Sequence, residues 1–270
     1  PLHRLTKYTS GCFRKVTMVQ RVLTAAVLIL VILGTLFAPS PWVFAGVMLL
    51  AMALCAYEAT ELVTTSKQSA LPAAAFWAAG FGALLFFATK EPLTAAWVAG
   101  LMGLTVLGVW SCWKRISWLA GAYPAGALAA LTLIHFMPQT GPPLVLAAMV
   151  PIWAGDTFAM LTGRQFGKTP LAPSLSPKKT REGAIGNVVA SLIASLAMGP
   201  ACGLPWGVSV GIGLSAGVVG QAGDLFESFL KRRAEKKDSG TLLPGHGGIF
   251  DRIDALLPHA ALTLCVLYFR

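Results

Sequence analysis

Charged residues are scarce in this sequence: Lys, Arg, Asp and Glu make up 12% of its 270 residues, whereas hydrophobic residues make up 56%. A soluble domain carries roughly 25% charged residues. With so few charges the chain cannot cover a water-facing surface, which excludes an ordinary soluble globular protein. Lipid must therefore surround much of it, and its length is better divided into spans of about 20 residues than into soluble domains.

Cysteine and histidine are also few, and neither is clustered. The five cysteines are Cys12, Cys55, Cys112, Cys202 and Cys265. A zinc site needs Cys or His ligands at paired spacings, so none is expected here. A cleavable signal sequence is not expected either, because the basic segment 1–21 lacks a short apolar core followed by a small-residue cleavage site. We expect this segment to be a retained polar tail.

Long apolar runs dominate the rest of the chain. They do not alternate with the period of 2 that strands show, and they are longer than strands, so they predict helices. Nine runs stand out, at about residues 22–37, 41–57, 71–88, 93–110, 118–136, 143–163, 184–200, 205–223 and 249–269. The predicted fold is an all-α, polytopic integral membrane protein with about nine transmembrane helices. About five belong to an N-terminal part, residues 1–140, and about four, with cytoplasmic loops, to a C-terminal part, residues 141–270.

Positive charge is distributed unevenly between the loops. If the N-terminus is cytoplasmic, all but two of the 21 Lys and Arg residues fall in cytoplasmic segments; the exceptions are Lys90 and Arg270. Because basic loops stay in the cytoplasm, nine spans then place the N-terminus inside and the C-terminus outside. The net charge of +10 is explained by topology, and nucleic-acid binding, the other use of a basic balance, is not expected. We expect a multi-pass protein of the cytoplasmic membrane.

Acidic residues gather on the same side, although the positive-inside rule does not require this. Asp156 lies inside the sixth span, where an ionisable group is costly and indicates function; a structural carboxylate paired with Arg or Lys of a neighbouring helix is the alternative. Glu58 and Glu61 close the second span on one face. They are interpreted as a solvated helix end, with support for a functional site as the alternative.

The loop after the sixth span is basic and has a helix-start signal. Ser176 followed by Pro177 is typical of an N-cap and a first helical position. Free N–H groups at a helix start bind anions, and Lys178 and Lys179 follow directly. We expect a phosphate site here, with an ordinary positive-inside loop as the alternative.

Two further clusters of carboxylates lie near the C-terminus. Asp224, Glu227, Ser228 and Lys231 are spaced i, i+3, i+4 and i+7, which puts them on one helical face. A solvated helix end with salt bridges is the alternative interpretation of that face.

The second cluster follows a glycine-rich turn around His246, after which Asp251 and Asp254 stand at i and i+3. Hard cations such as Mg²⁺ take carboxylate oxygens together with substrate phosphates. The alternative, Asp complementing a helix dipole, explains one of the two residues but not both.

These residues form a known pattern. The run Ser228-Phe-Leu-Lys231-Arg232, then four residues, then Lys237-Asp238-Ser239-Gly240-Thr-Leu-Leu-Pro244-Gly-His246-Gly-Gly-Ile-Phe-Asp251-Arg-Ile-Asp254 resembles the signature of phosphatidate cytidylyltransferases. The resemblance covers about residues 150–260 and includes Gly155-Asp156-Thr157 and the Ser176–Gly183 segment; residues 1–140 agree only in being apolar. Met160 departs from the pattern, at a position where a tyrosine is expected.

The resemblance implies transfer of cytidylate from CTP to phosphatidate at the cytoplasmic membrane face, with Mg²⁺ required and a second metal ion left open. It assigns metal binding to Asp224, Asp251 and Asp254. It assigns substrate and phosphate binding to Asp156, Ser176, Lys178, Lys179, Arg232 and Lys237. Lys231, Ser228 and His246 complete the predicted catalytic set with Asp224 and Asp251. The partners are CTP, phosphatidate and the lipid bilayer, and a homodimer is left open.

Two other classes remain as alternatives. A CTP-dependent kinase of a polyprenol-type lipid alcohol would share much of this chemistry, but the full match of residues 228–254 argues against it. A transporter of phosphorylated solutes would need inverted repeats and charges at the membrane midplane, whereas these charges gather on one face.

Overall fold

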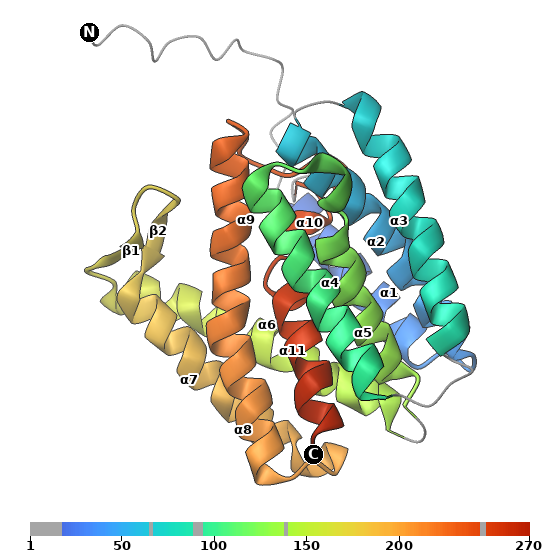
Figure 1. The fold of residues 1–270 in the computed structure, drawn as a ribbon. Helices are drawn as coiled ribbons and strands as arrows, with labels where there is room; N and C mark the ends of the chain where they lie inside the picture. The colour runs from blue at the N-terminus through green and yellow to red at the C-terminus, as the bar shows by residue number, and fades with distance from the viewer. Residues whose placement is uncertain (1–17, 65–66, 89–93, 138–139, 244–246) are drawn as a thin grey trace, which may run out of the picture.

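The computed structural model describes residues 18–64, 67–88, 94–137, 140–243 and 247–270. Helices make up nearly all of it (Figure 1). The N-terminal part contains α1 (Met18–Leu36), α2 (Pro41–Thr64), α3 (Lys67–Ala88), α4 (Ala95–Lys114), a short 3₁₀ helix η1 (Ser117–Leu119) and α5 (Ala122–His135). Most of the predicted polar tail, residues 1–17, lies outside the described residues.

The C-terminal part adds a small hairpin to its helices. It contains α6 (Gly141–Phe166), strands β1 (Pro170–Ala172) and β2 (Ser176–Thr180), α7 (Arg181–Met198), a 3₁₀ helix η2 (Pro200–Cys202), α8 (Trp206–Leu214), a π-helical turn η3 (Ser215–Gly220), α9 (Gln221–Arg233), α10 (Phe250–Ile253) and α11 (Leu256–Tyr268). Figure 1 shows α8 and α9 as one long column with the hairpin beside its C-terminal end.

Six helical segments of the described chain are long and apolar enough to cross a membrane. They are Pro41–Thr64, Gln68–Phe87, Ala95–Lys114, Ser117–His135, Gly141–Phe166 and Trp206–Arg233. Two shorter apolar helices, Ala26–Leu36 and Leu256–Tyr268, accompany them. The predicted all-α membrane fold is confirmed, and all nine apolar runs lie in helices. The count of nine spans and the side on which each terminus lies remain predictions.

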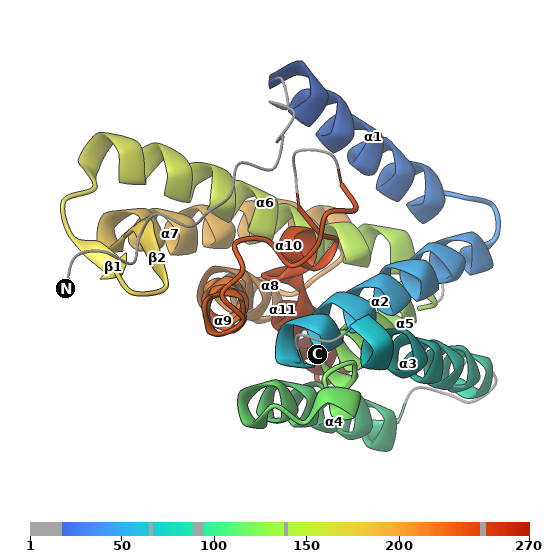
Figure 2. The ribbon, with the colours of Figure 1, turned by 90° about the horizontal axis from the view of Figure 1, so that it is seen from above.

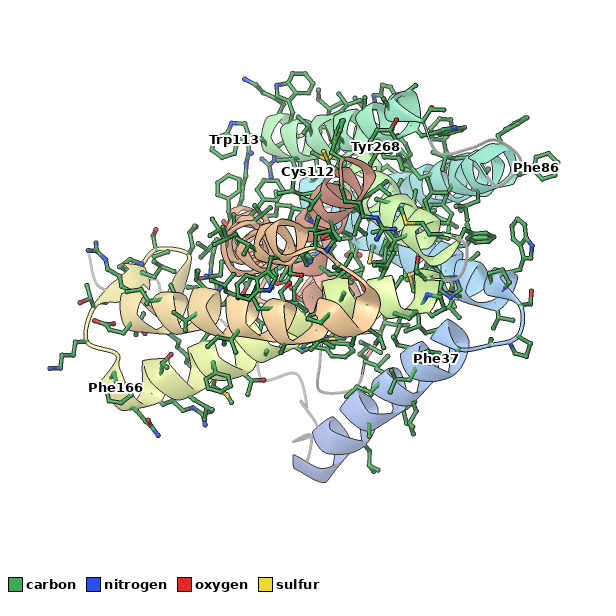
Figure 3. All side chains as sticks on the ribbon, turned by 90° about the horizontal axis from the view of Figure 1, so that it is seen from below. Phe37, Phe86, Cys112, Trp113, Phe166 and Tyr268 are labelled. Atoms are coloured by element: carbon green, nitrogen blue, oxygen red, sulfur yellow. The ribbon has the colours of Figure 1, made fainter. Side chains whose placement is uncertain are left out.

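The centre of the bundle is α5, whose residues are all buried. It is contacted by α2, α3, α4, α6 and α11, which enclose it (Figure 2). Large apolar side chains also cover the outside: Phe86 is 51% and Phe166 63% exposed, and both project from the periphery in Figure 3. An apolar exterior of this kind is stable when lipid is the solvent, because lipid tails are as apolar as the side chains.

The helix start predicted at Ser176 is wrong. Ser176 begins strand β2, which pairs with β1 so that Pro170 is opposite Thr180 and Ala172 opposite Ser176. The helix begins five residues later, because Thr180 is its N-cap: its Oγ1 accepts a hydrogen bond from Gly183 N at 3.1 Å. A two-stranded hairpin consists of edge strands, where a proline such as Pro177 is tolerated. The cations of this segment therefore project from a strand and not from a helix start.

The two ends of α4 offer a test of the predicted orientation, because Thr94 and Lys114 are both exposed and flank its apolar length. With a cytoplasmic N-terminus, Thr94 faces outside and Lys114 faces the cytoplasm. In a chain whose five cysteines have been replaced, we expect a membrane-impermeant maleimide to label Thr94→Cys in intact cells, and Lys114→Cys only after permeabilisation. The reverse labelling pattern would contradict the orientation.

Candidate active site

A polar cleft of about 530 Å³ opens between α6, α7, the hairpin and α9. Its walls carry both acids and bases on an otherwise apolar scaffold. The charged and amide side chains lining it are Asp156, Arg164, Lys178, Lys179, Asn187, Gln221 and Asp224. We call this the hairpin cleft. Three of the residues that the sequence assigned to substrate or phosphate binding, Asp156, Lys178 and Lys179, meet in it.

Asp156 reaches the hairpin cleft because α6 and α7 pack very closely. A Cβ at Gly155 would come within 2.7 Å of Asn187 Oδ1, so only glycine permits this approach. Asn187 then donates a hydrogen bond to Asp156 Oδ1 at 3.2 Å, and Ser191 Oγ donates to Asn187 Oδ1 at 3.3 Å. The buried side-chain amide of Asn187 thus fixes one carboxylate oxygen of Asp156. Among the described residues Asp156 has no Arg or Lys partner within ion-pair distance, which disfavours the structural alternative considered for it.

The opposite wall is formed by β2 and α9. Lys179, from β2, makes an ion pair with Asp224 of α9, and both side chains are about one-third exposed. The hairpin is held in place at its base, where Glu182 of α7 accepts hydrogen bonds from the backbone N–H of Lys168 at 3.2 Å and of Thr169 at 3.3 Å. An ammonium thus already stands beside Asp224, which shows that this carboxylate accommodates a cation.

A second polar cluster lies further along the same face of α9. Lys231 donates to Glu227 Oε2 at 2.9 Å and to Asp251 Oδ1 at 2.7 Å. The two carboxylates are almost fully buried, with side-chain exposures of 1% for Glu227 and 4% for Asp251. Buried charges are costly unless paired and hydrogen-bonded, so the ammonium of Lys231 stabilises the two buried carboxyl groups that it bonds.

The other oxygen of Asp251 organises the segment that precedes it. Asp251 Oδ2 accepts hydrogen bonds from Ser239 N and Gly248 N, both at 2.8 Å, and lies 2.9 Å from Ser239 Oγ. Burial alone would raise the pKa of Asp251, but hydrogen bonds from Lys231 and from these backbone N–H groups outweigh it and hold the pKa below its ordinary value. Asp251 is therefore an ionised carboxylate at neutral pH.

Asp254 and Glu227 connect the two clusters. Burial, followed by the negative charge of Asp224, raises the pKa of Asp254 to about 7. Its Oδ1 accepts a hydrogen bond from Ala255 N at 2.8 Å. Glu227 Oε1 is buried and receives no hydrogen bond. The carboxyl groups of Asp224, Glu227 and Asp254 thus lie close enough to influence one another, and one buried oxygen of the group has no hydrogen-bond partner.

The chemistry of Asp224, Glu227 and Asp254 fits a divalent cation such as Mg²⁺. The candidate ligands are hard carboxylate oxygens, and the buried Oε1 of Glu227 has no hydrogen-bond partner among the described residues, so a cation bound there would stabilise it. Within the described chain no three His, Cys, Asp or Glu side chains already form a ligand group. Mg²⁺ commonly uses one or two carboxylates and completes its shell with water and substrate phosphates, so an incomplete protein shell is compatible with it.

The other predicted residues are spread around these two clusters. Ser228 is partly buried and does not line the hairpin cleft. Arg232 is exposed and donates to the backbone oxygen of Leu175, in the hairpin turn, at 3.2 Å. Lys237 is exposed, and Ser176 is partly buried in β2. His246 lies outside the described residues. The predicted polar stripe on α9 therefore serves two places along its length: Asp224 lines the cleft, and Lys231 bonds Glu227 and Asp251 further along.

Sequence reasoning missed Asn187 and misjudged Glu58. Asn187, Ser191 and Ser195 are buried on α7 at i, i+4 and i+8, and this polar stripe within an apolar run could have identified Asn187. The interpretation of Glu58 as a solvated helix end is wrong. Its side chain is 4% exposed and accepts a hydrogen bond from Ser239 Oγ at 2.9 Å, from the far end of the chain.

A helical membrane bundle with carboxylates and ammonium groups gathered around one cleft is typical of an enzyme that handles phosphates. The sequence profile of the Cytidylyltransferase family matches residues 19–270. A phosphatidate cytidylyltransferase of Pseudomonas aeruginosa is 37% identical over 265 residues, 88% of this chain and 92% of the relative. A protein with the same name from Brucella abortus (strain 2308) is 34% identical over 251 residues, 90% of each chain. The chain belongs to the cytidylyltransferase family.

Removal of the Lys231 ammonium tests the second cluster. In Lys231→Met the buried carboxylates of Glu227 and Asp251 would face each other without a cation. Breaking a buried pair in this way costs about 3–5 kcal/mol, so we expect a clearly lower unfolding temperature for the detergent-solubilised protein. Arg232→Met, which removes the neighbouring exposed charge, should change it little. Equal unfolding temperatures for the two variants would show that Lys231 does not hold the cluster together.

Proposed function

We propose that this chain is a phosphatidate cytidylyltransferase, which joins CTP and phosphatidate to give CDP-diacylglycerol and pyrophosphate. The observation that carries the proposal is the hairpin cleft, where Lys178 and Lys179 stand opposite Asp156 and Asp224. Cations bind the phosphates of both substrates, and carboxylates can hold the metal that accompanies a nucleotide. The names of the relatives agree with this substrate pair.

The reaction needs positioning and charge neutralisation more than it needs a covalent intermediate. A phosphate oxygen of phosphatidate attacks the α-phosphorus of CTP, the bond from that phosphorus to the oxygen bridging to the β-phosphate breaks, and pyrophosphate leaves with the electron pair. Negative charge accumulates on the phosphoryl oxygens and the leaving group, so cations fixed near them lower the barrier. A Ser or Cys nucleophile is not required.

Lys179 is the side chain best placed to respond to substrate. Its ammonium pairs with Asp224 in this structure. When a nucleotide phosphate enters the cleft, Lys179 can turn to it and leave the Asp224 carboxylate free for a metal ion. Lys178 and Arg164, on the same walls, add positive charge around the phosphates. Asn187 keeps Asp156 in a fixed orientation through the hydrogen bond described above.

Mg²⁺ is the proposed cofactor. Asp224 would hold it at the edge of the hairpin cleft, with Asp254 next to it; Asp251 is a predicted ligand whose Oδ2 is occupied by the hydrogen bonds of the loop. When bound, Mg²⁺ would neutralise phosphate charge. Lys231 would keep Asp251 and Glu227 in place.

The predicted membrane orientation determines which side of the membrane the proposed active site faces. The hairpin, the C-terminal end of α9 and α10 lie toward the same end of the bundle (Figure 1), and this end carries the basic loops. By the positive-inside rule it faces the cytoplasm, where CTP is available. The acyl chains of phosphatidate would remain in the bilayer beside the helices while its phosphate enters the cleft.

A labelling assay tests the reaction directly. Purified protein in detergent with phosphatidate, Mg²⁺ and CTP labelled at the α-phosphate should yield a labelled lipid, and EDTA should stop the reaction. CTP labelled at the γ-phosphate should give labelled pyrophosphate and no labelled lipid. Lipid labelled only from the γ-phosphate, with an isoprenoid alcohol as acceptor, would instead identify a lipid kinase and refute the proposal.

Lys179→Ala distinguishes phosphate binding from a topological role of the basic loop. We expect kcat/KM for CTP to fall by about 100-fold, because removing one group that stabilises transition-state charge typically costs on the order of 10²–10³ in rate. Lys168→Ala is the matched control: Lys168 is an exposed cation of the same loop that does not line the cleft. Small and equal effects of the two substitutions would mean that these cations serve membrane topology alone.

A further inference from the structure

Glu58 lies in membrane-spanning helix α2, yet its side-chain partners belong to the segment between α9 and α11. The side chain is 4% exposed. Among the described residues, no Lys or Arg forms an ion pair with it. A buried carboxylate without a cation is costly unless hydrogen bonds replace its lost water. The hydrogen-bond donors around Glu58 are therefore needed to keep its side chain buried.

Three groups donate to the Glu58 carboxylate. Oε2 accepts from Phe250 N at 2.8 Å and from Ser239 Oγ at 2.9 Å, and Oε1 accepts from Ile249 N at 3.2 Å. The two backbone N–H groups belong to the start of α10, where a helix has no internal acceptors for them. Glu58 thus holds the start of α10 and Ser239 at once, from a different helix.

Ser239 links Glu58 to Asp251. Its N–H donates to Asp251 Oδ2 at 2.8 Å, while its Oγ lies 2.9 Å from both Asp251 Oδ2 and Glu58 Oε2. A hydroxyl has one proton to donate, so the N–H can serve Asp251 while the hydroxyl serves Glu58. The two carboxylates therefore meet at Ser239, so a displacement of Glu58 is passed to Asp251 through this residue.

The glycines of this loop fit around the Glu58 side chain. A Cβ at Gly240 would lie 2.5 Å from Glu58 Oε1, closer than real Cβ contacts allow. A Cβ at Gly248 would collide with Glu58 Oε2 and with Ser239 Oγ. The carboxylate occupies the space that side chains would need, which gives a physical reason for glycine at both positions.

We propose that Glu58 is a positioning residue for the reaction: through Ser239 and the N–H groups at the start of α10 it fixes the helix α10, which carries Asp251. This assigns the N-terminal half of the chain a part in the active site, although Glu58 itself does not touch substrate. The inference rests on the proposed function, since the position of Asp251 affects nucleotide transfer only if Asp251 takes part in it.

Glu58→Gln is the direct test, because the amide keeps the volume but places an NH₂ group against N–H donors. We expect kcat to fall by about tenfold or more while KM for CTP changes less than about threefold, since a group that only orders the reacting groups affects kcat. Glu61→Gln is the matched control, one turn further along α2 and paired with Lys236 at 2.8 Å. A wild-type kcat for Glu58→Gln would overturn the proposal.

A double-mutant cycle separates positioning from general stability. If Glu58 acts through Ser239, adding Ser239→Ala to Glu58→Gln should lower kcat much less than the two single effects combined; multiplicative effects would overturn the link. The same cycle measured on unfolding temperature needs no activity. If the wild-type protein makes no CDP-diacylglycerol, the proposed function fails, while the unfolding cycle still decides whether Glu58 and Ser239 are coupled.

A second variant covers the case in which Glu58→Gln does not fold. Gly240→Ala should displace the Glu58 carboxylate while leaving every ionisable group in place, and we expect a comparable loss of kcat. Gly46→Ala is its control, because it lies on the same helix as Glu58 and an added Cβ there meets nothing within 4 Å. Equal kcat values for the two glycine variants would contradict the proposal.

Discussion

The ammonium of Lys231, placed between two buried carboxylates, is the contact on which the C-terminal half depends. Ions removed from water lose several kcal/mol of solvation each, and only good geometry with further hydrogen bonds restores it. Here Lys231 joins α9 to the start of α10 at distances of 2.7 and 2.9 Å. The N–H groups of Ser239 and Gly248 donate to the other oxygen of Asp251. The loop has few alternative positions because each would leave a charge without a partner.

Close helix packing supplies the low-polarity surroundings in which such contacts are strong. Glycine at position 155 brings α7 close enough for Asn187 to reach Asp156, and glycine at 223 brings α9 within contact of the backbone of Asp254. Electrostatic interactions strengthen as water is excluded, and the same exclusion makes an unpaired group costly. A conformation that leaves any of these polar groups unpaired is therefore unstable, which favours a single geometry of the site.

Much of the fold follows from composition, because apolar length is a local property of the chain. Each of the nine apolar runs became a helix. The spacing of Asp224, Glu227 and Lys231 also predicted that α9 carries the polar groups, although not that they face two different clusters. The Ser176-Pro177 signal failed because strand pairing with β1 and the competing cap at Thr180 outweighed it. The partners of Glu58 could not be identified from the sequence, because Ser239 and Phe250 lie 181 and 192 residues away.

The π-helical turn at Ser215–Gly220 determines the direction in which the side chains of α9 point, with almost no effect on the length of the helix. Such a turn adds a residue to the helical ladder, and each residue rotates an α-helix by about 100° while advancing it only 1.5 Å. Gln221 Nε2 secures the turn by donating to Gly217 O and, at 3.2 Å, to Ala184 O of α7. Loss of a single residue here would leave the membrane-crossing length almost unchanged. It would rotate Asp224 away from the hairpin cleft and Lys231 away from Asp251, so the contacts of this helix's polar face depend on its winding as much as on its side chains.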